Sequence, residues 1–87
     1  MKRLELVFKA LSNINRLKII KMLRSSKKMS VTDISKELKI SFTAASRHLI
    51  ILRNFSVLLS DGKDNHVFYY LNSELPGDFQ KAIKLIP

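Results

Sequence analysis

The chain has 87 residues, 46% hydrophobic and 26% charged, and contains no cysteine. This length fits a single domain, and the lack of cysteine excludes disulfide scaffolds and thiolate metal sites. The net charge is +9, and residues 1–30 hold nine basic side chains against one acidic. Such a balance favours a polyanionic partner, with nucleic acid first and an anionic membrane surface second.

Hydrophobic periodicity predicts two helices in the first 25 residues. Leu4, Phe8 and Leu11 recur at i, i+4 and i+7, which indicates a helix over about 2–11. Asn13 is a suitable N-cap for a second helix, which ends at the SSKK segment. The apolar positions of this second helix are Ile14, Leu17, Ile20 and Leu23.

Two further helices follow, each opened by a capping residue. Ser30 and Asp33 form the pattern S-x-x-D, a capping-box variant that predicts a short helix over 31–38. Ser41 caps the next helix, which has a small, polar first half and an aliphatic second half. Its predicted buried stripe is Ala45, Leu49 and Leu52.

After Asn54 the pattern becomes strand-like. The segments VLLS (57–60) and HVFYYL (66–71) flank DGKDN (61–65), which predicts a β-hairpin with a five-residue loop. A last amphipathic helix over about 78–86 carries Phe79, Ile83 and Ile86 on one face. The predicted fold class is therefore mainly α, with helices and a two-stranded hairpin in one domain.

The short helix over 31–38 and the helix after Ser41, joined by a tight turn, are typical of a helix-turn-helix. The hairpin after them would act as its wing. The second helix of such a unit enters the major groove of double-stranded DNA, where arginine bonds guanine and hydroxyls bond bases or phosphates. We predict base contacts from Ser41, Thr43, Ser46 and Arg47, and backbone contacts from His48, Arg53 and Lys63, the last at the wing tip. His48 lies beside the buried stripe of its helix, so a structural role is the alternative for it.

The segments ALSNINRLKIIKML, VTDISKELKIS, SRHLIILR and HVFYYL resemble the ArsR/SmtB-like family of winged-helix transcriptional regulators, over about residues 4–71. This resemblance implies a homodimer that binds a palindromic operator and represses transcription, with the two terminal helices as the dimer interface. The interface residues would be Leu4, Phe8, Leu11, Phe79, Ile83 and Ile86; ordinary core packing is the alternative for these stripes.

Three positions depart from the family pattern. Lys39 and Ser56 stand where the family usually has glycine, so either these two turns differ or stability is lost locally. Phe42 replaces a residue that is often polar, and it either touches a thymine methyl group or folds back against the preceding helix. Ile50 lies off the buried stripe of its helix, where we expect it to be exposed.

The sequence offers no metal site, cofactor site or catalytic set. Metal sensors of the family use cysteine pairs before the recognition helix or Asp and His pairs on the last helix, whereas the last helix here has only Asp78. A glycine-rich phosphate loop, a thiol nucleophile and paired carboxylates are also missing, so we expect no enzyme. The apolar runs are too short to span a membrane, and we expect a cytoplasmic protein.

Several readings of the function stay open at this point. The first is a sequence-specific repressor without a metal-sensing site. The others are a winged-helix protein-interaction module, a regulator of another winged-helix family, and a module that binds unusual duplex geometry without reading sequence. Arg47, Thr43 and Ser46 favour DNA as the partner, whereas Phe42 and Ile50 would suit a protein surface.

Overall fold

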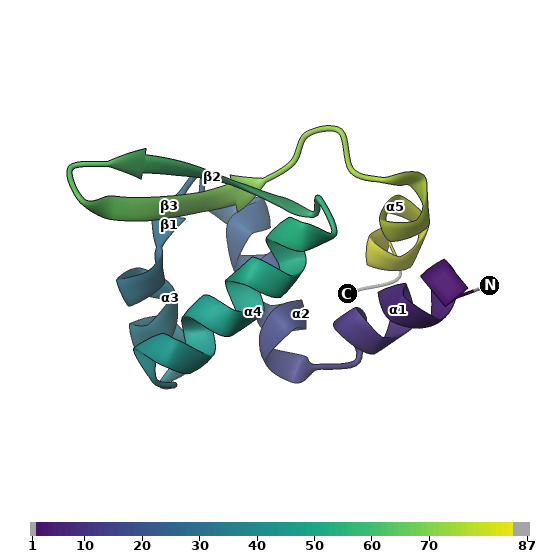
Figure 1. The fold of residues 1–87 in the computed structure, drawn as a ribbon, viewed down its shortest axis with the longest axis horizontal. Helices are drawn as coiled ribbons and strands as arrows, with labels where there is room; N and C mark the ends of the chain where they lie inside the picture. The colour runs from purple at the N-terminus through teal and green to yellow at the C-terminus, as the bar shows by residue number, and fades with distance from the viewer. Residues whose placement is uncertain (1, 85–87) are drawn as a thin grey trace.

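A computed structural model describes residues 2–84, which form five helices and a three-stranded antiparallel sheet (Figure 1). The helices are α1 (Lys2–Leu11), α2 (Ile14–Ser25), α3 (Val31–Leu38), α4 (Phe42–Asn54) and α5 (Gly77–Lys84). The strands are β1 (Met29–Ser30), β2 (Leu58–Lys63) and β3 (His66–Leu71). The predicted helices and the hairpin are confirmed: α3 and α4 form the helix-turn-helix, and β2 with β3 forms the wing.

The three predicted N-caps are confirmed by their hydrogen bonds. The side chain of Asn13 accepts from the backbone N–H of Asn15 at 2.9 Å and opens α2. Ser30 and Asp33 make the reciprocal capping box of α3, with both bonds at 3.1 Å. The hydroxyl of Ser41 accepts from a backbone N–H one turn into α4 at 3.0 Å. Because these bonds join residues two or three positions apart, the start of each helix is encoded locally.

The loop of the hairpin differs from the prediction. Lys63 pairs with His66, so β2 runs on through Asp61 and Gly62 and the loop is only Asp64–Asn65. Both loop residues have positive φ, at 52° and 64°, as a two-residue type I′ turn requires. The five-residue loop was wrong because aspartate and asparagine tolerate this conformation without glycine. Lys63 therefore ends β2, directly before the turn.

A short strand that the sequence analysis missed joins the wing to the helix-turn-helix. In β1, Met29 pairs with Tyr69 and Ser30 pairs with Phe68, so β3 is the central strand of the sheet. Lys28, directly before β1, forms an ion pair with Asp61 on β2. Its ammonium group also lies 5.1 Å from the centroid of a wing tyrosine ring. The middle of the wing is thereby tied to the start of α3.

The core lies between α2, α3, α4 and the sheet, and α5 closes it at the end away from the wing tip (Figure 1). Its largest fully buried side chains are Phe79, Ile19, Ile20, Ile34, Leu49, Leu52, Leu58, Val7 and Val57. Phe79 and Ile83 are buried within this chain, so the prediction that they face a partner subunit is corrected. An amphipathic stripe predicts that one face of a helix is buried, but not which surface covers that face. In α5 the apolar face is covered by the chain's own core.

The exposed apolar surface of the N-terminal region lies on α1 and at the start of α2. Val7 and Ala10 turn towards the core, whereas Phe8 is 59% exposed and Leu11 is half-buried. Ile14 is 62% exposed, unlike Ile20 and Leu23, which share the apolar pattern of α2 and are buried. The side chain of Leu4 and all of Ile86, both predicted interface residues, lie outside the part of the chain that the structure describes.

The two turns that usually carry glycine keep their left-handed geometry here. Lys39 ends α3 with φ 57° and ψ 43°, and Ser56 follows α4 with φ 63°. A side chain at such a φ crowds its own backbone. Of the two predicted alternatives, altered turns or local strain, the structure therefore shows the second.

Candidate nucleic-acid interface

The geometry of α4 decides which of its side chains are accessible. Ala45, Leu49 and Leu52 are fully buried, as predicted, and they fix the helix on the core. The opposite face therefore turns outward, along the rows Phe42–Ser46–Ile50 and Thr43–Arg47. Ser46 is half-buried on this face, and the other four side chains are exposed.

A shallow hollow of about 370 Å³ lies on the outward side of α4. It is lined by Phe42, Thr43, Ser46, Arg47, Ile50 and Ile51. The structure thus brings together three predicted base-contacting side chains, Thr43, Ser46 and Arg47, on one accessible face. The guanidinium of Arg47 makes no hydrogen bond or ion pair with any described residue, which leaves its donors available to an external acceptor.

The two apolar residues on this face are both exposed. Phe42 is 58% exposed and is not folded into the core, and Ile50 is 39% exposed as expected. Phe42 also borders a second, smaller hollow between the start of α3 and the wing tip. The other residues around this second hollow are Ser30, Val31, Thr32, Asn65, His66 and Val67. These residues were not predicted from the sequence because their proximity depends on the two-residue turn and on the pairing of β1.

His48 lies half-buried beside the core stripe of α4, the position that was predicted for it. Its Nδ1 atom lies 3.2 Å from a guanidinium nitrogen of Arg16. Because arginine only donates, Nδ1 must accept, and the imidazole proton sits on Nε2. Arg16 also donates to the carbonyl oxygen of Ala10 at 2.6 Å and to that of Lys9 at 3.3 Å. Half-buried His48 therefore ties α4 to the junction between α1 and α2, which agrees with the structural alternative for this residue.

The electrostatics of this contact favour neutral histidine. Partial burial lowers the pKa of His48, and the charges of Arg16 and Arg47 lower that pKa further. Burial also lowers the pKa of Arg16, which is nevertheless a permanent cation at neutral pH. A protonated His48 would lose the Arg16 hydrogen bond and place two like charges side by side.

The remaining predicted backbone contacts lie around the wing. Arg53 is exposed near the C-terminal end of α4, and its guanidinium is 3.5 Å from the hydroxyl of Ser60 on β2. Lys63 is exposed at the end of β2. Ser41 is exposed at the opposite end of α4, where its hydroxyl oxygen is already used as the N-cap. These groups extend the accessible surface from the helix to the wing.

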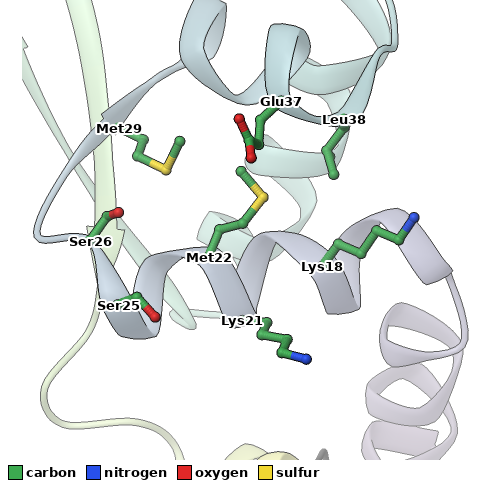
Figure 2. Close-up of a pocket in the computed structure, with 8 residues that line it drawn as sticks. All are labelled: Lys18, Lys21, Met22, Ser25, Ser26, Met29, Glu37 and Leu38. Atoms are coloured by element: carbon green, nitrogen blue, oxygen red, sulfur yellow. The ribbon is translucent and has the colours of Figure 1, made fainter.

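A further open hollow of about 600 Å³ lies between α2 and α3 and shares no lining residue with the two hollows beside Phe42. Figure 2 shows Met22, Glu37 and Leu38 facing one another across it, with Lys18 and Lys21 along its edge. Both signs of charge therefore surround an apolar floor.

The described residues contain no group of three or more His, Asp or Glu side chains that could hold a metal ion. Among residues 2–84, every helix is too short or too polar to span a bilayer.

Comparisons with known proteins agree with this geometry. A family model for bacterial regulatory proteins of the arsR family matches residues 13–55, which include α2, α3 and α4. The transcriptional repressor SdpR of Bacillus subtilis is 35% identical over 72 residues, which cover 83% of this chain and 79% of that repressor.

Solved structures show the same arrangement of elements. HlyU from Vibrio cholerae aligns with a TM-score of 0.74 at 32% identity, over 92% of this chain and 83% of that chain. A homodimeric winged helix-turn-helix DNA-binding domain from Mycobacterium bovis aligns with a TM-score of 0.77, over 98% of this chain and 75% of that chain. Its identity is 22%, so this second likeness concerns the fold alone.

Proposed function

Because the chain belongs to the ArsR family of bacterial regulatory proteins, we propose that it is a transcriptional repressor that binds a specific operator in double-stranded DNA. The observation that carries this proposal is the outward face of α4. Its guanidinium and hydroxyl groups are presented by a helix whose other face is locked into the core. Arg47 would bond guanine, with Thr43 and Ser46 beside it on the base edges.

The backbone contacts come from the ends of this surface. Arg53 and Lys63 would pair with phosphates on either side of the groove, and the net charge of +9 would draw the protein towards DNA over longer distances. Neutralisation of about six to eight phosphates by a dimer predicts that log affinity falls with log salt with a slope of about −5 to −7.

The proposed repressor acts as a homodimer on a palindromic operator. The dimer surface would include Phe8 and Leu11, which lie on one side of α1, together with exposed Ile14. Large apolar side chains gathered at one end of a small domain are typical of a subunit interface. The homodimeric state of the Mycobacterium bovis domain, which shares this fold, is consistent with such an assembly.

The proposed repressor has no metal-sensing site and no enzymatic activity. The first part of this proposal rests on the lack of cysteine and of a cluster of three metal-binding side chains among the described residues, and the second rests on the family of regulators to which the chain belongs. The signal that releases the operator would then be of another kind.

The experiment is selection of bound sequences from a random duplex pool, followed by titration of the selected duplex at several salt concentrations. We expect a symmetric motif and the salt slope given above. Arg47→Ala should weaken binding roughly 5- to 150-fold, equivalent to about 1–3 kcal/mol, and relax the preference at one position of each half-site. The matched control is Lys81→Ala, which removes one exposed positive charge from α5, away from the wing.

Three outcomes would contradict the proposal. A pool that yields no motif, although the protein binds random duplex in a salt-dependent way, would indicate binding without sequence readout. Failure to bind any duplex would favour the protein-interaction module, which the exposed Phe42 and Ile50 would suit. Equal losses for Arg47→Ala and Lys81→Ala would reduce the role of Arg47 to general charge.

A further inference from the structure

Phe42 is the first residue of α4, at the end of a recognition helix that reaches deepest into a groove. The side chain is 58% exposed. It takes no part in the core cluster, to which other apolar residues of α4 belong. It stands between the hollow on the outward face of α4 and the hollow beside the wing tip. An exposed phenyl ring thus stands where these two hollows of the proposed DNA-binding surface meet.

The chemistry around the ring limits what it can contact. Its neighbours in the outward hollow include the hydroxyls of Thr43 and Ser46 and the guanidinium of Arg47. In the major groove these groups have many acceptors and donors available, but a phenyl ring has one apolar partner on the base edges, the C5-methyl group of thymine. Among the described residues, the N-terminal turn of α4 offers this ring as its one large apolar group facing outward.

Ile50 is the other exposed apolar residue in the same row of α4. It lies eight residues after Phe42, which is about 12 Å further along the helix axis. Ile50 is also less exposed than Phe42, at 39% against 58%, and it belongs to the C-terminal half of α4, whereas the N-terminal residues of a recognition helix contact the bases. Base contact therefore falls to Phe42 and not to Ile50.

We propose that Phe42 determines specificity by packing on a thymine methyl group in each half-site of the operator, beside the guanine read by Arg47. This inference rests on the proposed function, since it assigns a base to a residue of the same surface. Burial of one methyl group against the ring contributes about fourfold in affinity, and two half-sites together give about fifteenfold.

The test uses the selected duplex with deoxyuridine substituted for deoxythymidine, one position at a time in both half-sites. Uracil lacks only the C5-methyl group and keeps the same hydrogen-bonding edge. We expect the unmodified protein to lose about fifteenfold at one symmetric pair of positions. Phe42→Ala should bind the thymine and uracil duplexes with equal affinity, whereas Ile50→Ala should keep the discrimination.

The outcomes separate this inference from the proposed function. Absence of a selected duplex would refute the proposed function itself. If a duplex is selected but uracil has no effect at any position, or Phe42→Ala keeps the full uracil effect, the assignment of Phe42 is overturned. Phe42→Ala that leaves both affinity and discrimination unchanged would instead point to a protein contact for this ring. Because Phe42 lies outside the core, circular dichroism should show an intact fold for the variant.

Discussion

Replacement of Lys39 by glycine should stabilise the protein, because this residue holds a left-handed turn at a cost. Its φ is 57° and its ψ is 43°, at the turn between α3 and α4. The backbone bonds of the turn are from Lys39 to the carbonyl of Lys36 at 3.3 Å and from Ile40 to that of Ser35 at 3.1 Å. Glycine can keep both bonds, and the exposed lysine side chain contributes no core packing.

The size of the effect follows from two opposing contributions. A residue with a side chain pays about 1–2 kcal/mol to enter the left-handed region. Glycine loses about 0.5–1 kcal/mol more backbone entropy on folding. The net gain is about 0.5–1 kcal/mol, or about 2–8 °C in Tm for a domain of this length. Ser56→Gly, at φ 63° beyond the other end of α4, should give a similar gain that adds to the first.

The assay is thermal and urea denaturation followed by circular dichroism, at one fixed protein concentration so that subunit association does not shift the result. Lys39→Ala is the control, since alanine removes the charge and long side chain of lysine but keeps the strained φ. A glycine variant no more stable than the alanine variant would refute the reasoning, because removal of strain would then have no measurable effect. A gain in both variants would assign the effect to charge.

Two further predictions concern the contacts of α1 and α4. The pKa of His48 is lowered in the folded state, so stability is fully present above the unfolded-state pKa of about 6.5 and falls as the pH drops towards the folded-state value. Urea titrations between about pH 7.5 and 5 should show this decline in stability. The decline should be smaller in His48→Asn and unchanged in the control His66→Asn. An unchanged decline in His48→Asn would contradict the assignment of this pH dependence to His48. Phe8→Glu should convert the proposed homodimer to a monomer, as measured by light scattering. The control Leu6→Glu changes an exposed residue on the other side of α1 and should leave the dimer intact. Dimers of equal stability in both variants would exclude the Phe8 side of α1 as the interface.

The parts of the fold that the sequence predicted depend on local interactions. Asn13, Ser30 and Ser41 begin their helices through bonds to backbone groups two or three residues away, so a short window of sequence is sufficient. The outward face of α4 was predictable for the same reason, since its buried stripe follows the helical period. Thr43 and Arg47 were accordingly expected on the accessible side.

The features that the sequence did not predict depend on distant partners. The strand at Met29 exists because Tyr69 lies beside it, and neither residue signals this by itself. DGKDN contains two turn signals, and the stronger one, Asp-Gly, lies within the strand because pairing of Leu58 with Leu71 sets the register. The sequence likewise gave no sign that Arg16 would reach across 32 positions to His48.

The positive charge of the first 30 residues serves two purposes that the sequence alone does not separate. Arg3 donates to a carboxylate of α5 at 2.8 Å, Arg24 donates to a carbonyl near the end of α5 at 2.7 Å, and Arg16 joins α1 to α4. These guanidinium groups hold the terminal helices on the core. Arg16 and Arg24 bond to neutral partners and keep their full charge, so they still attract a polyanion over a Debye length. Arg16 uses all three of its guanidinium nitrogens for bonds within the fold, whereas Arg24 uses one and keeps further N–H donors available. We expect most direct phosphate contacts to come from α4 and the wing, which carry the proposed recognition surface, and the excess charge of α1 and α2 to act mainly on the rate of association.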